Sequence, residues 1–168
     1  NSTPLTDGAS AVLIASEAWA LKRNLPIKAR LLAWDESAIN FVGDEGLLMG
    51  PAYSIGKLLI KENKTLSDID FFEIHEAFAS QTLSLIKALG SQKFCSERLG
   101  LAAPIGDIDL NKHNVYGGSL SLGHPFAATG GRLVLTLAEL LHKNKGSLGL
   151  LSCCTAGGMA VSALIESI

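Results

Sequence analysis

The sequence predicts an α/β fold in which helices cover a mixed sheet of five strands. Short apolar runs that contain β-branched residues alternate three times with longer runs of helical spacing, which is typical of strands that lie parallel in one sheet. The chain then ends in two apolar runs joined by a glycine-containing turn, a pattern that predicts an antiparallel strand pair. Of the 168 residues, 48% are hydrophobic and 18% are charged, so the chain has enough apolar material for one compact domain.

The first part of the chain contains two predicted strands and two predicted helices. Residues 10–16 are apolar and partly β-branched, and they lead into residues 17–23, whose composition is helical and whose end is basic. Residues 27–34 alternate between apolar and basic side chains before they become apolar throughout, which predicts a strand. Residues 35–50 have no stable period and are predicted to form a loop, and the proline that follows suits the start of a helix over residues 53–63.

The second part repeats this order and ends in the strand pair. A predicted strand over residues 69–74 is followed by a helix over residues 77–89, which a glycine stops. Residues 91–114 are irregular and long for a loop, which is typical of a functional segment or of a helix with a weak pattern. A clear amphipathic helix covers residues 133–143. The last two predicted strands are residues 147–154 and residues 159–165.

Charge and cysteine content exclude several classes of protein. Fourteen basic and sixteen acidic residues give a net charge of −2, so nothing indicates a nucleic-acid partner. The apolar stretches are far shorter than the roughly 18 to 20 residues that cross a bilayer, and we expect neither a transmembrane segment nor a signal peptide. Three cysteines, two of them adjacent, form neither a disulfide framework nor a paired zinc pattern. We therefore expect no metal and a reducing compartment, which is the cytoplasm in a bacterium or the mitochondrial matrix in a eukaryote.

Three segments place reactive side chains at similar points of the predicted fold. His75 lies where a strand gives way to a helix, His124 comes just before a proline that opens a helix, and Cys154 ends a strand. The carboxyl ends of parallel strands and the amino ends of the following helices meet at one edge of a sheet. We therefore expect the three side chains to share one pocket.

The residue types at this edge suit proton transfer. A helix amino terminus disfavours imidazolium, so His124 is expected to stay neutral and to act as a general base. The same dipole favours a thiolate at Cys154, and the backbone N–H groups of Ala156 and Gly157 in the following turn could receive an oxyanion. His75 could hold a water molecule or donate to a second oxyanion. The alternative is open at this point, because isolated histidines are often structural and strand cysteines often belong to the core.

Three known motifs are incomplete in this chain. Residues 118–123 have P-loop spacing, but no Lys-Ser or Lys-Thr pair follows, which excludes nucleotide hydrolysis. A zinc-protease motif begins at His75, yet Ala79 stands where the second ligand is needed, and no serine lies between glycines as in the hydrolase elbow.

The other two cysteines are expected to be structural. Cys95 has no predicted role in the site, and Cys153 is expected to point to the sheet face opposite Cys154 and to belong to the core.

Four motifs of the sequence resemble, in order and spacing, the C-terminal half of thiolases. The resemblance covers the chain from end to end, and it is specific because the four motifs match together. Histidine instead of asparagine before Glu-Ala-Phe, and the run Gly-Pro-Ala-Tyr-Ser at residues 50–54, are similar to the 3-ketoacyl-CoA thiolases of fatty-acid oxidation trifunctional complexes. The four motifs are residues 1–10, 75–79, 114–125 and 154–158.

The resemblance implies a layered α/β/α half of an enzyme that cleaves 3-ketoacyl-CoA with CoA to acetyl-CoA and a shortened acyl-CoA in fatty-acid β-oxidation. CoA is then a substrate, and no cofactor is bound permanently. On this mapping His124 activates the nucleophile and helps bind the enolate oxygen, and Cys154 moves the proton to and from the acetyl carbanion. The N–H of Ala156 contributes to the second oxyanion hole, His75 replaces the asparagine that positions a water, and Phe78 lines the pantetheine channel.

The resemblance also implies partners for residues 1–168, which match the C-terminal domain only. In thiolases the acyl-accepting cysteine belongs to the N-terminal half, and no part of this chain resembles that half. The chain alone is therefore expected to be inactive and, with the missing half absent, to expose an apolar face and self-associate. The implied partners are the N-terminal half, a second copy in a homodimer, and a hydratase/dehydrogenase subunit of a trifunctional complex. Ala156, where the family usually has glycine, is a departure within the motifs.

Two other interpretations stay open. A thiolase-like half that has lost its chemistry could serve in binding or dimerisation only, although such a scaffold has no physical need for both His124 and Cys154 at one edge. A ketoacyl synthase shares the fold and uses one cysteine with two histidines, but the hairpin at residues 154–158 speaks against it.

Overall fold

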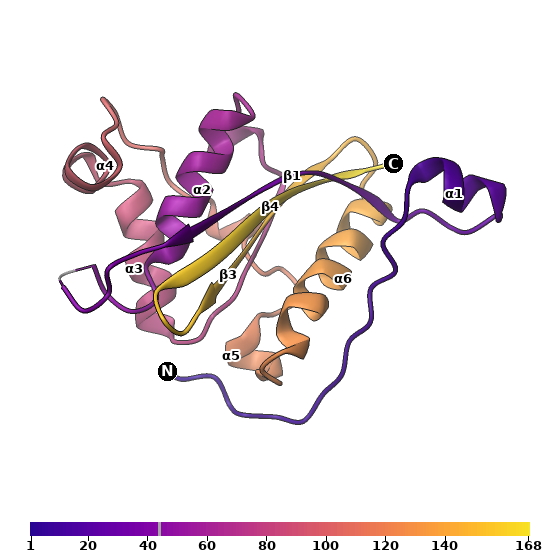
Figure 1. The fold of residues 1–168 in the computed structure, drawn as a ribbon, viewed down its shortest axis with the longest axis horizontal. Coiled ribbons are helices and arrows are strands. Elements are labelled where there is room, and N and C mark those ends of the chain that lie inside the picture. Colours follow the sequence, from indigo (N-terminus) through magenta and orange to yellow (C-terminus); the bar gives the residue numbers. More distant parts are fainter. Residues whose placement is uncertain (44) are drawn as a thin grey trace.

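The computed structural model describes residues 1–43 and 45–168, which form a mixed four-stranded sheet with helices on both faces (Figure 1). The strands are β1 (Ala29–Ala38), β2 (Phe71–Ile74), β3 (Leu148–Thr155) and β4 (Met159–Ser167). They lie in the order β1-β4-β3-β2, with β2 and β3 parallel and the other two pairs antiparallel. The helices are α1 (Glu17–Lys22), α2 (Gly50–Lys61), α3 (Ala79–Leu89), α4 (Gln92–Leu99), α5 (Ser119–Leu122) and α6 (Ala128–Lys143), with short 3₁₀ helices at Leu66–Asp68 and Leu110–Lys112.

Two apolar clusters hold helices on the two faces of the sheet. α2 and α3 contribute to the cluster on one face, and α6 packs on the other (Figure 1). Along β3, Leu150 joins the first cluster and the next residue, Leu151, joins the second, because neighbouring side chains of a strand point to opposite faces. α6 contributes Leu133 and Leu137, fully buried leucines one helical turn apart. No helix within the described residues is long and apolar enough to cross a membrane.

The predicted strand over residues 10–16 is wrong, and the sheet has four strands instead of five. In the part of the chain that the structure describes, these residues are extended and pair with no strand. Residues 1–16, which we call the N-terminal arm, run outside α5 and α6 (Figure 1). A strand needs a hydrogen-bonded neighbour, and residues 10–16 pair with no strand of the sheet.

Two further features differ from the prediction, and a third settles an alternative that the sequence left open. Parallel pairing is limited to β2 and β3, because β1 lies beside β4 at the far edge of the sheet. β1 continues through residues 35–38, predicted to form a loop, since these residues pair with β4 as far as Met159. The irregular segment contains α4. This helix begins after Ser91, and Oγ of Ser91 accepts from the N–H of Phe94 (3.2 Å). It ends at Gly100, which has φ of +68°. α4 is short and polar, so its pattern in the sequence is weak.

Asn114 closes the free edge of β2. A single parallel bridge between Phe72 and His113 stands at the position of a fifth strand. The backbone N–H of Asn114 donates to the Phe72 carbonyl (2.8 Å). The Asn114 side-chain amide accepts from the N–H of Ile74 (2.8 Å) and donates to the Ile74 carbonyl (2.9 Å). This side chain thus replaces the backbone of a neighbouring strand.

The N-terminal arm connects two loops that lie far apart in the sequence. The N–H of Thr3 donates to the carbonyl of Ala77 (3.2 Å) in the loop after β2. The carbonyl of Pro4 accepts from the N–H of His124 (3.0 Å) in the loop before α6. The arm therefore ties the two loops that carry predicted site residues to each other.

Candidate active site

Two histidines from distant parts of the chain face each other at one end of the sheet. His75 follows β2, where its backbone N–H donates to the Ser152 carbonyl of β3 (2.8 Å), and its side chain is buried. His124 lies between α5 and α6 and is half-buried. The centroids of the two imidazole rings are 4.4 Å apart, and the ring planes are inclined by 42°. The structure thus brings together two of the three residues that the sequence singled out.

Both imidazoles are neutral near pH 7. Burial, followed by the charges of His124 and Arg132, lowers the pKa of His75 to about 4. Burial, followed by Arg132, also lowers the pKa of His124. The sequence predicted a neutral His124 from a helix dipole, but α6 begins only at Ala128, and burial is the main cause. A neutral imidazole can accept a proton, which a general base requires.

The third predicted residue, Cys154, is the last but one of β3, at the same end of the sheet, and packs against α3. Its Sγ lies 3.9 Å from Oε1 of Gln81 in α3 and beside the backbone N–H of Ala77. Among the described residues it has no hydrogen bond to either imidazole. Burial is the main cause that raises the pKa of the Cys154 thiol to about 12. The predicted shift toward thiolate is therefore reversed, and the thiol is protonated at neutral pH.

Each imidazole has a hydroxyl partner that sequence reasoning missed. Nδ1 of His75 is 2.8 Å from Oγ of Ser119, the first residue of α5, and Nδ1 of His124 is 2.7 Å from Oγ1 of Thr129 in α6. Arg132, about one turn further along α6, donates from Nη2 to Oγ of Ser119 at 2.9 Å. In the sequence, only Arg132 could have indicated this network, because it is the single charged residue among the small and apolar residues 128–138.

A buried carboxyl lies in the field of the same arginine. Glu73, in β2, is fully buried, and neither of its oxygens has a hydrogen-bond partner among the described residues. Burial raises the pKa of Glu73 to about 7, Arg132 opposes this rise, and Glu76 adds to it. Nε and Nη1 of Arg132 and Nε2 of His113 are also buried without a partner there. The interior around the arginine is therefore polar and incompletely hydrogen-bonded.

The backbone packs tightly beside this polar group. Oε2 of Glu76 accepts from the backbone N–H of Leu120 (3.2 Å). A Cβ at Gly118 would overlap the Glu76 carboxylate and the amide of Asn114, so a side chain does not fit at this position. The close approach brings the loop after β2 against the start of α5, and hence the first histidine against its serine partner.

The other predicted site residues lie near the surface. Ala156 and Gly157 are exposed in the turn between β3 and β4, where Gly157 has φ of +98°, a value that glycine adopts without strain. Phe78 is 45% exposed and forms an isolated antiparallel bridge with Ser2 of the N-terminal arm. Only Thr155, the last residue of β3, separates Cys154 from this turn.

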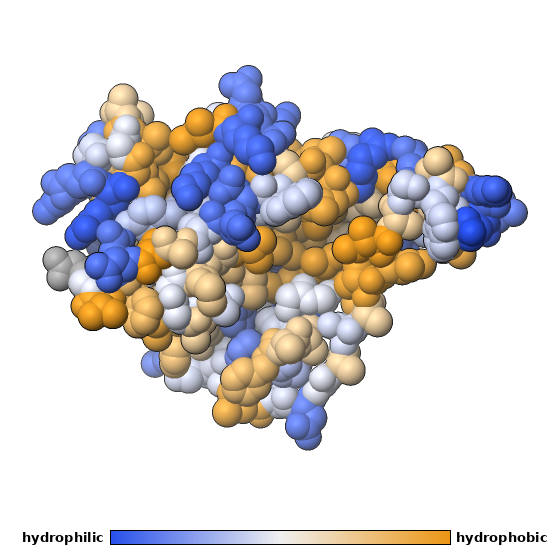
Figure 2. Space-filling view, viewed as in Figure 1, coloured by the Kyte–Doolittle hydropathy of each residue, from blue (hydrophilic) through white to orange (hydrophobic). Residues whose placement is uncertain are grey.

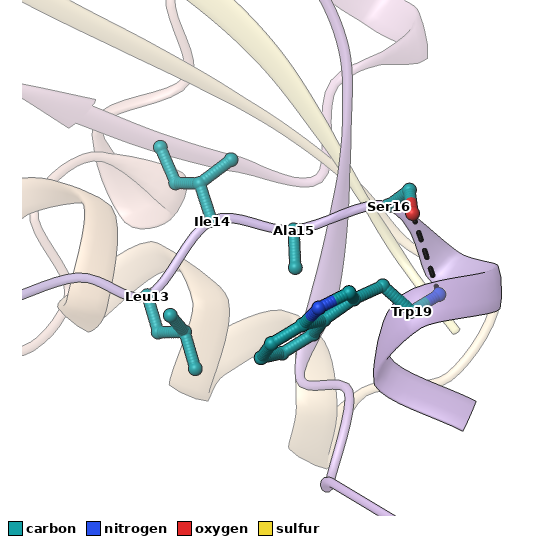
Figure 3. A pocket seen from close by; sticks show the side chains of 5 residues that line it. All are labelled: Leu13, Ile14, Ala15, Ser16 and Trp19. Atoms are coloured by element: carbon teal, nitrogen blue, oxygen red, sulfur yellow. Dashed lines mark hydrogen bonds between the residues drawn. The ribbon is translucent and has the colours of Figure 1, made fainter. Parts of the chain in front are cut away.

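Elsewhere, residues 1–43 and 45–168 contain no group of three or more His, Cys, Asp or Glu side chains that could hold a metal ion. A shallow hollow lies beside α1, where the arm passes Trp19 and Oγ of Ser16 accepts from the backbone N–H of Trp19 (Figure 3). Leu13, Ile14 and Ala15 complete its lining. The hollow has no titratable side chain, so it offers no group for proton transfer.

The layered architecture, with one mixed sheet between helices, is a thiolase-like α/β fold. The sequence pattern of the family "Thiolase, C-terminal domain" matches residues 25–167. The chain belongs to this family of thiolase C-terminal domains. Residues 1–24, which include the arm, lie outside the match.

Individual relatives match over nearly the whole chain. A 3-ketoacyl-CoA thiolase of Yersinia pestis (strain Pestoides F) is 43% identical over 166 residues, which are 99% of this chain and 38% of that protein. The peroxisomal 3-ketoacyl-CoA thiolase of Saccharomyces cerevisiae has a TM-score of 0.72 and 35% identity over 90% of this chain and 37% of its own. Its structure has five layers built from two core domains of identical topology. Another structure of the yeast peroxisomal thiolase is described as dimeric. The Acat5 thiolase of Ascaris suum in complex with coenzyme A has a TM-score of 0.70 and 29% identity over 92% of this chain and 35% of its own. The chain thus spans little more than a third of the length of these proteins.

Proposed function

We propose that this chain is the C-terminal catalytic half of a 3-ketoacyl-CoA thiolase, an acyltransferase of fatty-acid β-oxidation. The complete enzyme would cleave 3-ketoacyl-CoA with CoA into acetyl-CoA and a shortened acyl-CoA. The observation that carries the proposal is the pair of neutral imidazoles, 4.4 Å apart, at the end of the sheet where β3 ends one residue after Cys154. The coenzyme A bound by the Ascaris relative supports CoA as a substrate, and this chemistry uses no permanently bound cofactor.

In this proposal the site residues divide the proton transfers. His124 takes the proton of the attacking thiol, whose sulfur bonds to C3, and the N–H groups of Ala156 and Gly157 receive the negative charge that forms on the 3-keto oxygen. The bond between C2 and C3 of the substrate then breaks, and His75 and the protonated His124 donate to the enolate oxygen of the leaving acetyl-CoA. The Cys154 thiol gives its proton to the carbon of this enolate. When CoA attacks the acyl-enzyme, Cys154 takes the CoA proton, the bond between the acyl group and the nucleophile breaks, and His124 returns its proton to the released nucleophile.

The acyl-accepting nucleophile is proposed to come from the N-terminal half. Cys95 is fully buried, and its thiol donates to carbonyls at the end of α3, as expected for a structural cysteine. Cys153 packs in the α6 cluster on the opposite sheet face from Cys154, also as expected, and burial raises the pKa of its thiol to about 11. One thiol is fully buried and the other packs under α6 with a raised pKa, so in this proposal covalent catalysis needs a cysteine from outside this chain.

An incompletely covered sheet face supports a second core domain as partner. The strand register puts Trp34 and Val161 on the α6 face of the sheet, but their side chains are 60% and 40% exposed. Figure 2 shows an apolar area that continues from the strands toward the segment before α1. The two core domains of the yeast relative suggest that the missing half covers this area.

We further propose that the complete protein forms a homodimer, as the yeast relative does, and has a hydratase/dehydrogenase partner. We propose a bacterial cytoplasm as its compartment, because the Yersinia relative is bacterial.

A chimera tests the proposal. This chain would be joined to the amino-terminal part of the Yersinia pestis relative, and cleavage of 3-ketoacyl-CoA by CoA would be followed for the chimera and for the chain alone. We expect turnover only in the chimera, and we expect His124→Ala to abolish it. Turnover by the chain alone would refute the missing nucleophile. A folded, CoA-binding chimera without turnover would instead indicate a domain that only binds or dimerises.

A further inference from the structure

Ser119 joins Arg132 to His75 in the interior of the site. Its Oγ accepts from Nη2 of Arg132 at 2.9 Å and lies 2.8 Å from Nδ1 of His75, and the serine is fully buried. We propose that Arg132 and Ser119 are positioning residues that hold the proton of His75 on Nε2, whereas His124 remains free to change its tautomer. The tautomers follow from the geometry alone, and their use in catalysis rests on the proposed thiolase function.

The hydrogen bonds of Ser119 select the direction of its bond to His75. A guanidinium only donates, so Arg132 occupies one lone pair of the serine oxygen. If Nδ1 of His75 donated as well, the serine proton would be buried without an acceptor among the described residues. If Ser119 donates to Nδ1 instead, its proton has an acceptor, and its oxygen still accepts from Nη2 of Arg132. Nδ1 is then an acceptor, and the proton of the neutral ring lies on Nε2.

The charge of Arg132 favours the same tautomer. The guanidinium reaches the Nδ1 side of His75 through a single hydroxyl group. A lone pair on Nδ1 is attracted by this positive charge, whereas an N–H dipole at the same position is repelled. Burial, the charge of His124 and then Arg132 lower the pKa of His75 to about 4, so the ring is neutral near pH 7 and carries a single ring proton.

His124 has a different environment. Its Nδ1 lies 2.7 Å from Oγ1 of Thr129, a buried hydroxyl with no other side-chain hydrogen bond in the described part of the chain. A hydroxyl with one such partner can turn, so it either donates to Nδ1 or accepts from it. Both tautomers of His124 are therefore hydrogen-bonded at Nδ1, and Nε2 can change between acceptor and donor.

This difference gives separate tasks to the two adjacent rings. A general base has to gain and lose a proton, which His124 can do at Nε2 without giving up Thr129. His75 offers a fixed N–H donor, which is preorganised for negative charge on a substrate oxygen. One ring thus moves a proton while its neighbour keeps its own.

Nitrogen NMR of the 168-residue chain, labelled with ¹⁵N-histidine, tests the proposal at neutral pH without substrate. Couplings between ring nitrogens and ring C–H protons show which nitrogen is protonated, and a His75→Asn variant identifies the His75 signals. We expect less than about 10% of His75 to carry its proton on Nδ1, and comparable populations of both tautomers in Ser119→Ala. Ser119→Thr keeps a hydroxyl and should restore the single tautomer. Ser121→Ala, which changes an exposed serine of the same helix, should leave the tautomer unchanged.

A His75 ring protonated on Nδ1 in the unaltered chain overturns the proposal, and this result needs no variant to fold. The proposal is also overturned if the Ser119→Ala chain is folded, as native methyl signals would show, and His75 in it still carries its proton on Nε2 only. Because no turnover is measured, an inactive chimera would contradict the proposed function and leave the assignment of the tautomers untouched.

Discussion

Replacing Glu73 with glutamine tests whether the buried carboxyl of β2 is neutral in the folded chain. Glu73 is fully buried, and its two oxygens have no hydrogen-bond partner in the part of the chain that the structure describes. Burial raises the pKa of Glu73 from 4.5 to about 7. Arg132 acts in the opposite direction but does not hydrogen-bond to the carboxylate, so burial prevails.

The two pKa values fix the sign and the size of the effect. The stability that the neutral carboxyl contributes is fully present below pH 4.5 and is lost as the pH rises through about 7. A rise in the pKa of Glu73 from 4.5 to about 7 corresponds to about 3 kcal/mol. Glutamine has no proton to lose. Relative to the unaltered chain, Glu73→Gln should therefore gain about 3 kcal/mol of unfolding free energy as the pH rises from 4.5 to above 7.

Urea denaturation followed by circular dichroism measures the unfolding free energy of both chains across this pH range. The informative quantity is the change of their difference with pH, because a constant offset from the new amide group cancels. Contributions of the buried histidines cancel as well, since both chains contain them. Glu97→Gln, at an exposed position of α4, controls for the loss of one negative charge. A difference that stays flat, or that falls as the pH rises, would show that Arg132 keeps Glu73 ionised and would refute the reasoning.

Packing and burial give three more expectations. Gly118→Ala should destabilise the chain by about 1–3 kcal/mol, because its Cβ would overlap two side chains, whereas Gly130→Ala has open space and should stabilise α6 by up to about 1 kcal/mol. Equal melting temperatures for this pair would contradict the tight fit. Leu137→Ala, fully buried in α6, should cost about 2–5 kcal/mol in urea denaturation, and Leu135→Ala, 44% exposed on the same helix, should change stability by less than about 0.5 kcal/mol. With a pKa of about 12, roughly one Cys154 thiol in ten thousand is ionised at about pH 8, so iodoacetamide should label this residue only after denaturation. Rapid labelling of the folded chain, detected by peptide mass spectrometry, would disprove its burial.

The sequence predicted the parts of the fold and site that depend on local pattern. The change from strand to helix identified His75, and the start of a helix identified His124, because these positions follow from periodicity and from the shared edge of parallel strands. The prediction failed for residues 10–16, whose β-branched composition is that of a strand but which pair with no strand of the sheet. Composition shows that a segment can form a strand, but it does not show whether another strand lies beside it in the fold.

The hydroxyl partners of the histidines had no comparable signal. Ser119 lies 44 residues from His75 and 13 residues from Arg132, so only the tertiary fold brings these three side chains together. The ionisation of Cys154 was predicted with the wrong sign for a related reason. The dipole argument considers the adjacent backbone, whereas the pKa of the thiol depends on everything that excludes water from it.

Because of Asn114, the two edge strands of the sheet, β2 and β1, differ in their ability to pair with a strand of another polypeptide. At β2, main-chain groups of Phe72 and Ile74 that an incoming strand would need are already engaged by the backbone and the side chain of this one residue. At the opposite side, β1 has no strand beyond it among the described residues, and its outward main chain can still pair. A further strand would therefore find free main-chain groups beside β1 and engaged ones beside β2.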